Sequence, residues 1–268
     1  MPPYDIERRT GELKGITILI NHNHSEGILR FILRSSEAIS RIRKAIDKIQ
    51  TQIQWVEVIS CNIQPIPAAL PEGPEEVILT AKEFITEDYG CAAVMFRPLS
   101  FMQVTYEVAA RLYARFAKIV EDAKIDSMFD LYCGVGAFSL AAAPFIKRGI
   151  GIEISQEAIH SAESACALKG IFHLRFFKGD LSLATPHLSL EPADLFMVNP
   201  PRRGLDSATL ELVLAKLPTN LVYSSCNPDT LVRDLSKLTD QYDVKLLAPF
   251  DMFPLTEHLE ALIWLKRR

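Results

Sequence analysis

A cysteine with the sequence surroundings of a nucleophile stands near the end of the chain, in residues 223–228 (Tyr-Ser-Ser-Cys-Asn-Pro). The run 221–223 is short, apolar and β-prone, which predicts a buried strand. Asn227 is a favourable N-cap, and Pro228 suits the first position of a helix. The dipole of that helix is expected to favour the thiolate of Cys226, the form that attacks electrophiles. Taken by itself, an ordinary small core cysteine is the alternative.

A glycine-bearing turn follows an apolar strand in residues 129–138 (Phe-Asp-Leu-Tyr-Cys-Gly-Val-Gly-Ala-Phe). Paired glycines let the backbone approach a ligand closely at the first strand-to-helix crossing of a doubly wound sheet. Ser139 replaces the last glycine of the dinucleotide fingerprint, and no Walker lysine follows. Residues 149–153 predict a second strand that ends in Glu153, where such folds bind ribose hydroxyls. A ligand with a ribose but without a phosphate chain indicates S-adenosylmethionine.

A third motif, Asn-Pro-Pro-Arg-Arg-Gly in residues 199–204, closes the apolar run 194–198. The two prolines after Asn199 stiffen a loop at the carboxyl end of a strand, where ligands bind in open α/β sheets. Asn-Pro-Pro followed by an aromatic residue is typical of methyltransferases that act on exocyclic amino groups. Arg202 stands at that place instead, which disfavours amino-group chemistry and supplies a cationic donor for phosphate or a base edge.

Together these motifs resemble the RNA uracil-5-methyltransferases that depend on S-adenosylmethionine. The Asn-Pro-Pro-Arg-Arg-Gly form and the Asp-Met-Phe-Pro of residues 251–254 resemble the 23S ribosomal RNA branch. The transfer RNA branch usually carries Asp-Pro-Pro-Arg instead. Residues 9–14 also resemble the ribosomal branch, so the likeness covers essentially the whole chain. Five segments match the family in order: 101–105, 130–136, 199–202, 224–227 and 253–260.

The resemblance implies covalent catalysis with Cys226 as the nucleophile and Glu260 as the base. Attack of the thiolate on C6 of uracil turns the ring into an enolate, so that C5 becomes able to take a methyl group. Glu260 then removes the C5 proton, and the thiolate leaves. Residues 259–265 predict a strand that returns beside the strand before Cys226, which would bring acid and thiol to one pocket mouth. A partly dry pocket is expected to raise the pKa of Glu260 towards neutrality.

The resemblance also implies contacts to the cofactor and to the RNA. Gln103 is expected at the methionine end of the cofactor, Glu153 at the ribose and Asn199 near the transferred methyl group. Arg202 is expected to contact the RNA substrate or the active site, and no metal ligand is predicted. The full set of expected cofactor contacts is Gln103, Tyr132, Gly134, Glu153 and Asn199.

An upstream cysteine cluster that binds an iron–sulfur centre is normal in the bacterial ribosomal branch. This chain begins at Met1 without such a segment, and three explanations stay open: a truncated form, a naturally short gene product or a lineage without the cluster. The five cysteines contain no Cys-x-x-Cys pair. No iron–sulfur cluster is therefore expected in this chain.

The order of predicted elements indicates the α/β fold class. Strand and helix patterns alternate in the second part of the chain, which predicts a parallel sheet with helices on both faces. The resemblance makes this a Rossmann-like class I methyltransferase domain, with a mostly parallel doubly wound sheet and an antiparallel C-terminal strand. Two domains are expected in 268 residues: a smaller N-terminal α+β domain that contacts RNA (1–95) and the catalytic domain (96–268).

The charge balance is unusual for a protein whose expected partner is RNA, most specifically 23S ribosomal RNA. The formal net charge is −4, so shape and a splayed-out base are expected to provide much of the specificity. Neither DNA nor a membrane is an expected partner, and a cytoplasmic monomer is expected. A helix is predicted around residues 38–50, within a basic stretch that contains Arg30, Arg34, Arg41, Arg43, Lys44 and Lys48.

Three alternatives stay open. Transfer RNA uracil-5 methylation differs only in the substrate. RNA cytosine-5 methyltransferases place a second cysteine in the Pro-containing motif, but no cysteine lies between Cys166 and Cys226, so uracil fits better. A non-catalytic RNA-binding assembly factor on the same fold has no need of a thiol and a base at one pocket, which argues against it.

Overall fold

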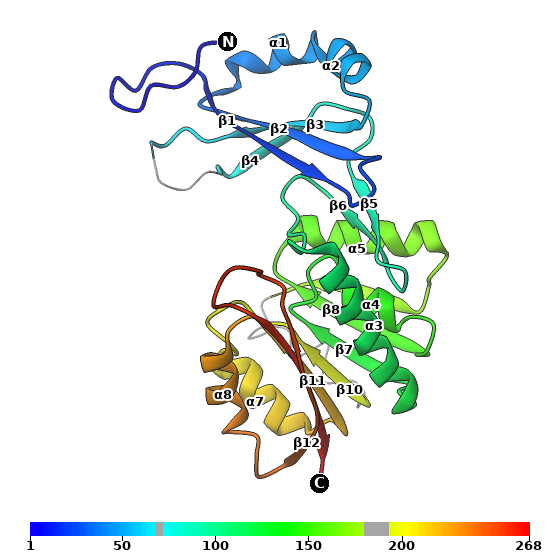
Figure 1. Cartoon of the computed structure of the whole chain (residues 1–268). Coiled ribbons are helices and arrows are strands. Elements are labelled where there is room, and N and C mark those ends of the chain that lie inside the picture. The colour runs from blue at the N-terminus through cyan, green and yellow to red at the C-terminus, as the bar shows by residue number, and fades with distance from the viewer. Residues whose placement is uncertain (68–71, 180–192) are drawn as a thin grey trace. The chain divides into compact units, whose positions relative to one another are not determined.

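The computed structural model describes residues 1–67, 72–179 and 193–268 of the chain. These residues divide into two compact units. The first comprises residues 1–87 with 95–100, and the second comprises residues 88–94 with 101–268. Figure 1 shows the elements of both units.

A four-stranded sheet forms the first unit, with strand order β1-β2-β3-β4. Neighbouring strands pair antiparallel, except for β2 and β3, which are parallel. Short helices follow β2, and their apolar side chains pack with those of the sheet in one cluster that includes Leu33, Ile42 and Ile59. The elements are β1 (Leu13–Ile20), β2 (Gly27–Leu33), a 3-10 turn (Ser36–Ala38), α1 (Ile39–Arg43), α2 (Ile46–Gln52), β3 (Val56–Ile63) and β4 (Glu75–Ile78). A separate two-stranded sheet consists of β5 (Ile85–Asp88) and β6 (Ala93–Phe96).

The basic helix expected around residues 38–50 is two short helices. Ala45 donates a backbone hydrogen bond to the Ile42 carbonyl three residues earlier, and this tighter turn separates α1 from α2. Arg30, counted with the basic residues of this stretch, lies on β2 instead. Its side chain is only 3% exposed and is paired with the carboxylates of Glu72 and Glu76.

A seven-stranded sheet forms the centre of the second unit, in the order β12-β13-β11-β10-β7-β8-β9. The five strands from β11 to β9 are parallel, and β13 runs antiparallel to both of its neighbours. The predicted doubly wound sheet with an antiparallel C-terminal strand is therefore confirmed. The strands are β7 (Ser127–Leu131), β8 (Arg148–Glu153), β9 (Leu174–Lys178), β10 (Leu195–Val198), β11 (Asn220–Ser225), β12 (Tyr242–Phe250) and β13 (Glu260–Arg267).

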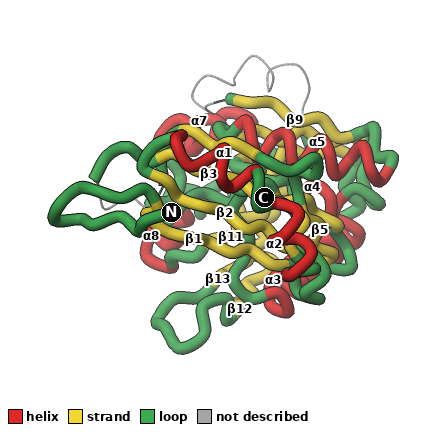
Figure 2. The backbone as a smooth tube through the Cα atoms, turned by 90° about the horizontal axis from the view of Figure 1, so that it is seen from above, coloured by secondary structure: helices red, strands yellow, loops and turns green. Residues whose placement is uncertain are grey.

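Helices lie on both faces of this sheet. Figure 1 shows α3 and α4 together on one side and α7 and α8 on the other. The edge strand β9 lies beside α5 (Figure 2). The helices are α3 (Tyr106–Asp122), α4 (Ala137–Ala142), α5 (Gln156–Lys169), α7 (Ser207–Lys216) and α8 (Pro228–Leu235).

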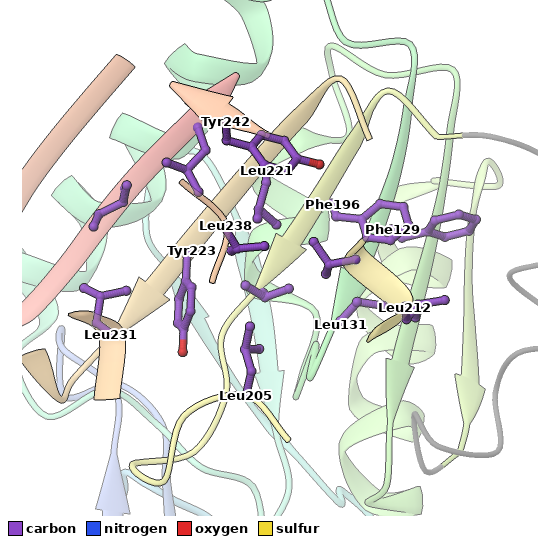
Figure 3. Packing of buried hydrophobic residues seen from close by; sticks show 14 of the residues in the cluster. Phe129, Leu131, Phe196, Leu205, Leu212, Leu221, Tyr223, Leu231, Leu238 and Tyr242 are labelled. Carbon is purple, nitrogen blue, oxygen red and sulfur yellow. The ribbon is translucent and has the colours of Figure 1, made fainter. Parts of the chain in front are cut away.

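A buried cluster joins the sheet to α7 and α8. Tyr223 of β11 is fully buried, and Leu231 of α8 packs in the same cluster as Leu221 (Figure 3). Because the central strands are covered on both faces, they are continuous apolar runs rather than alternating ones. The described residues include no helix that is long and apolar enough to cross a membrane.

Candidate active site

Cys226 and Glu260 meet where β11 ends and β13 begins. The two strands pair antiparallel, with Ser225 opposite Ala261 and Ser224 opposite Leu262. The next position of this register places Cys226 opposite Glu260. Directly opposed residues point to the same face of a sheet, so the thiol and the carboxyl group lie together. The predicted return of the C-terminal strand to this position is confirmed.

Glu260 is a buried carboxyl group with one short hydrogen bond. Its side chain accepts from the Ser224 hydroxyl through Oε1, and the residue is 3% exposed. Burial raises the pKa of Glu260 to about 7, and the Ser224 hydrogen bond opposes this rise. The carboxyl group therefore titrates near neutral pH, which is the range suited to a general base.

The thiol of Cys226 is less acidic than its place beside a helix predicted. The helix α8 begins at Pro228, and Asn227 caps it by accepting from the Asp229 amide at 3.1 Å, as predicted. Burial nevertheless raises the pKa of Cys226, and the nearby charge of Glu260 raises it further. Desolvation thus exceeds the contributions that lower the pKa of the thiol, and the stabilisation of its thiolate by the helix dipole stays a prediction.

Arg202 is the cation that opposes this rise. Its side chain is hydrogen-bonded to Cys226 and lowers the pKa of the thiol. The loop that carries Arg202 follows β10, and the amide of Asn199 at its start donates to the Leu131 carbonyl at 3.4 Å. The Asn-Pro-Pro-Arg motif thus places Asn199 beside the end of β7 and Arg202 at the thiol.

The glycine turn and Glu153 form a second cluster at the carboxyl ends of β7 and β8. The Gly134 amide donates to Oε2 of Glu153 at 3.1 Å. Gly134 has φ +53, and a Cβ atom built on it would meet no atom of the described residues within 4 Å. The backbone is thus open to a ligand at this point, next to a carboxylate suited to ribose hydroxyls.

Tyr132 is held by contacts within the protein that the sequence did not predict. Its hydroxyl donates to Asp206 at 3.0 Å and lies 2.7 Å from the Thr209 hydroxyl. Its backbone is left-handed, with φ 63. The hydroxyl therefore fastens the glycine turn to the start of α7, and the ring and backbone are what Tyr132 can offer to a cofactor.

Gln103 lies before α3 and is hydrogen-bonded to the hydroxyl of Tyr113. Tyr113 is buried, and its ring packs edge-on against Tyr89 and Phe138. Glu260 is close enough to contribute to the raised pKa of Tyr113. Gln103 is thus fixed through its partner near the carboxyl group at the start of β13.

Asp130 is a site residue that sequence reasoning did not single out. Its carboxylate accepts from the amide and the hydroxyl of Ser139 through Oδ2, at 3.2 and 2.6 Å. Burial raises the pKa of Asp130 to about 7, and Oδ1 has no hydrogen-bond partner among the described residues. The sequence feature that could have revealed Asp130 is a charged residue inside the apolar strand β7. A buried oxygen of this kind is suited to an ammonium donor such as the methionine end of S-adenosylmethionine.

These residues fit S-adenosylmethionine. An open glycine backbone, a carboxylate for the ribose and an unpartnered buried oxygen occur together around β7 and β8. They lie where the strand order reverses between β7 and β10, which is the ligand crevice of doubly wound sheets. Within the described ranges, no group of three or more His, Cys, Asp or Glu side chains could hold a metal ion.

The fold and this crevice define a class I methyltransferase. The structure is similar to that of the Pyrococcus abyssi tRNA (uracil-54, C5)-methyltransferase in complex with S-adenosyl-L-homocysteine, with a TM-score of 0.80 and 23% identity. The match covers 98% of this chain and 62% of the archaeal one, so this chain spans less than two thirds of that protein. At this identity the likeness shows the fold alone.

The sequence places the chain in a family. A profile of the family described as tRNA (Uracil-5-)-methyltransferase matches residues 78–268. The chain is 42% identical to the 23S rRNA (uracil(747)-C(5))-methyltransferase RlmC of Vibrio vulnificus, over 100% of its own length and 71% of the relative. The RlmC protein of Xenorhabdus nematophila is 38% identical over 97% of this chain and 69% of the relative. This chain therefore belongs to the tRNA (uracil-5-)-methyltransferase family, which confirms the predicted enzyme class, uracil-C5 methylation with S-adenosylmethionine as the methyl donor.

Proposed function

We propose that the chain methylates C5 of a uridine in 23S ribosomal RNA, at the position equivalent to uracil 747 of its relatives. The observation that supports this substrate most strongly is the 42% identity to RlmC over the whole of this chain. The Asn-Pro-Pro-Arg-Arg-Gly loop supports the same branch. The Pyrococcus abyssi likeness does not favour transfer RNA, because it is a likeness of fold.

Cys226 and Glu260 carry the covalent steps of this proposal. The Cys226 thiol gives its proton to water, and the thiolate forms a bond to C6 of uracil while the electron pair of the C5–C6 double bond moves into the ring enolate. Bound S-adenosylmethionine supplies the methyl group that C5 takes. Glu260 accepts the C5 proton, the double bond re-forms, and the C6–sulfur bond breaks to release Cys226.

The surrounding residues support these steps in defined ways. Arg202 supplies positive charge at the sulfur before attack, and Ser224 limits how far burial raises the pKa of Glu260. Gly134 and Glu153 would hold the adenosine end of the cofactor. Gln103 would bind its methionine end, and the Asn199 side chain would lie near the transferred methyl group. Asp130 would accept a hydrogen bond from the cofactor's amino group.

RNA contact and chemistry are assigned to different parts of the chain. The N-terminal residues 1–95 form the RNA-contacting domain of this proposal, and residues 96–268 carry the chemistry. Exposed cations on α1 and at its C-cap support the first assignment, because they include Arg41, Arg43 and Lys44. The protein acts as a cytoplasmic monomer in this proposal, where a reduced thiol at Cys226 is maintained.

The test is methyl transfer to unmodified transcripts. The full chain would be incubated with isotopically labelled S-adenosylmethionine and either 23S ribosomal RNA or transfer RNA, and the labelled nucleotide located by mass mapping. The expected product is 5-methyluridine at the 747-equivalent position of 23S ribosomal RNA. Label confined to transfer RNA, or label in 5-methylcytidine, would contradict the proposal.

A further inference from the structure

Asp234 is a buried carboxylate that none of the steps above uses. It lies on α8 with its side chain 1% exposed. Through Oδ2 it accepts from the Leu205 amide at 2.8 Å and from the Tyr223 hydroxyl at 2.9 Å. Through Oδ1 it accepts from Arg233, whose Nε lies at 2.9 Å. One carboxylate therefore joins the loop after β10, the strand β11 and the helix α8; Figure 3 shows Tyr223 and Leu205 in this region.

The loop of residues 202–205 is fastened to α8 along its length. The Arg202 carbonyl accepts from the Asn227 side chain at 2.9 Å and from the Thr230 hydroxyl at 3.3 Å. The Arg203 carbonyl accepts from the Arg233 guanidinium at 2.9 Å. With the Leu205 amide on Asp234, successive backbone groups of the loop are thus bound to one helix.

Gly204 shows how closely the loop approaches this helix. Its φ is +80, and a Cβ atom at this position would lie 2.5 Å from both an Arg233 guanidinium nitrogen and Asp234 Oδ2. Only a glycine fits such a contact without displacing one of these two side chains. The close approach keeps the Arg233–Asp234 pair directly against the loop.

The Arg202 side chain belongs to the same loop and reaches the Cys226 sulfur. The loop backbone determines from which point the Arg202 side chain extends, so the contacts that fix residues 202–205 also determine whether its guanidinium can reach the sulfur. We propose that Asp234 is a positioning residue that, through Leu205, Tyr223 and Arg233, holds the Arg202 guanidinium on Cys226 and so activates the nucleophile. This inference deepens the proposed function and rests on Cys226 being the nucleophile.

The direction in which the pKa of Cys226 changes distinguishes a positioning role of Asp234 from a direct electrostatic effect of its charge. The charged groups that act on Cys226 are Glu260 on β13 and Arg202 on the loop, with opposite effects on the thiol. Removing the negative charge of Asp234 would by itself make a neighbouring thiol more acidic. Loss of a positioned Arg202 would make the thiol less acidic. An Asp234→Asn variant should therefore show which effect acts.

The experiment measures the pH dependence of Cys226 alkylation by iodoacetamide in the folded full chain, with each cysteine quantified separately by peptide mass spectrometry. It needs neither RNA nor cofactor, so its outcome is independent of the methyl-transfer test. Asp234→Asn is expected to move the alkylation midpoint about one unit to higher pH, which is roughly a tenfold slower reaction at neutral pH. Arg202→Gln should produce a shift in the same direction.

The double variant Arg202→Gln with Asp234→Asn decides the mechanism. If Asp234 acts through Arg202, the second substitution adds no further shift to the first. The matched control is Asp229→Asn, which removes an exposed carboxylate from the first turn of the same helix. It is expected to leave the midpoint unchanged or to lower it, with Arg202 present or absent.

A further variant keeps the proposal testable if Asp234→Asn does not fold. Tyr223→Phe removes one hydrogen bond to Asp234 without changing any charge. It is expected to move the alkylation midpoint to higher pH. The reaction at neutral pH should be roughly threefold slower, because a single hydrogen bond is lost. An unchanged or lower midpoint in folded Asp234→Asn, or in folded Tyr223→Phe where the first variant does not fold, would overturn the proposal.

Discussion

The thiol and the carboxyl group of this site oppose each other electrostatically. Burial raises the pKa of both Cys226 and Glu260, and the charge of Glu260 adds to the rise at the thiol. A buried pair of this kind avoids carrying two negative charges at once, so its two proton losses are coupled. Arg202 lowers the pKa of Cys226, and Ser224 lowers the pKa of Glu260, so each neighbour favours the deprotonated form of one group.

The pH profile of methyl transfer tests the role of Ser224. Glu260 must be ionised to act as the base, so it should contribute a rise in rate through about pH 7, below the range in which the Cys226 thiol with its raised pKa ionises. Ser224→Ala removes the hydrogen bond that lowers this pKa. The rising limb of the profile should move roughly one pH unit towards alkaline pH, because a hydrogen bond to a charged group is worth about that much. Single-turnover rates across the pH range would measure the shift. The exposed Ser236→Ala serves as the control, and an identical profile for Ser224→Ala would contradict the assignment.

Glu260 should also destabilise the fold when it is ionised. Its pKa in the folded protein lies above its ordinary value, so the stability that its protonated form provides is present below about 4.5 and is lost as pH rises through about 7. Glu260→Gln should be inactive, because it lacks the base, but more stable at pH 8 by on the order of 3 kcal/mol. Denaturant unfolding at pH 8 and at pH 4.5 measures this difference.

The gain should nearly vanish at the lower pH, where the carboxyl group is protonated in the folded protein and about half protonated in the unfolded chain. Equal gains in the free energy of unfolding at pH 8 and pH 4.5 would mean that shape or packing, rather than charge, distinguishes glutamine from glutamate at position 260.

The positions of Cys226 and Glu260 in the fold were largely predictable, whereas their electrostatics were not. Cys226 and Glu260 stand next to strong local signals, a strand end with a helix cap and a second apolar strand. The acidity of the thiol depends on burial and on Glu260, which only the folded sheet brings together. Asp234 was not predictable, because its partners lie 29 residues away at Leu205 and 11 residues away at Tyr223.

At the scale of elements, the turn after β7 contains two glycines with different tasks. Both have positive φ, +53 at Gly134 and +79 at Gly136. A Cβ atom at Gly136 would lie 3.0 Å from Ala162 and 3.1 Å from the Phe176 ring. One at Gly134 would enter open space. The second glycine is therefore needed for packing, and we expect the first to be needed for ligand access.

Alanine at each position should separate these tasks. Gly136→Ala should lower the free energy of unfolding by roughly 2–3 kcal/mol, because left-handed backbone strain adds to overpacking. Gly134→Ala should lower it by about 1 kcal/mol, from backbone strain alone, and should weaken S-adenosylmethionine binding at least tenfold. Denaturant unfolding and calorimetric titration provide the two measurements. Unimpaired cofactor binding by Gly134→Ala would contradict a cofactor site above this turn.

The elements themselves were mostly predictable because each has a local signature. The apolar strands β7, β10 and β11 and the capped start of α8 lie where the sequence placed them. The break between α1 and α2 was not predictable, because a single i to i+3 hydrogen bond decides it within a continuous helical pattern. The burial of Arg30 was missed for a related reason, since Glu72 and Glu76 lie far from it in sequence.

At the scale of the whole molecule, a net charge of −4 requires the cations that bind RNA to be concentrated locally. The triple variant Arg41→Gln, Arg43→Gln and Lys44→Gln should weaken RNA binding and leave cofactor binding unchanged. The slope of log affinity against log salt should fall in magnitude by ~2, at about 0.7 per phosphate contact. Filter binding over a series of salt concentrations measures both effects.

A matched triple variant tests whether location matters rather than total charge. Lys169 and Lys216 lie in the last turns of α5 and α7, and Lys237 follows α8. These helices begin at the carboxyl edge of the sheet, so the three lysines lie at the edge opposite the site. Their replacement by glutamine should change RNA affinity little. Equal losses in the two triple variants would mean that RNA responds only to net charge.

The most direct test of the account as a whole is covalent trapping of Cys226 on RNA. A 23S ribosomal RNA fragment with 5-fluorouridine at the 747-equivalent position would be incubated with the protein and S-adenosylmethionine, then analysed by denaturing mass spectrometry. Fluorine at C5 cannot leave as a proton, so the bond from sulfur to C6 should persist. The account predicts a protein–RNA adduct that carries one added methyl group and maps to Cys226, and that is absent from Cys226→Ala. An adduct that survives in Cys226→Ala, or methylation of the natural RNA by that variant, would contradict it.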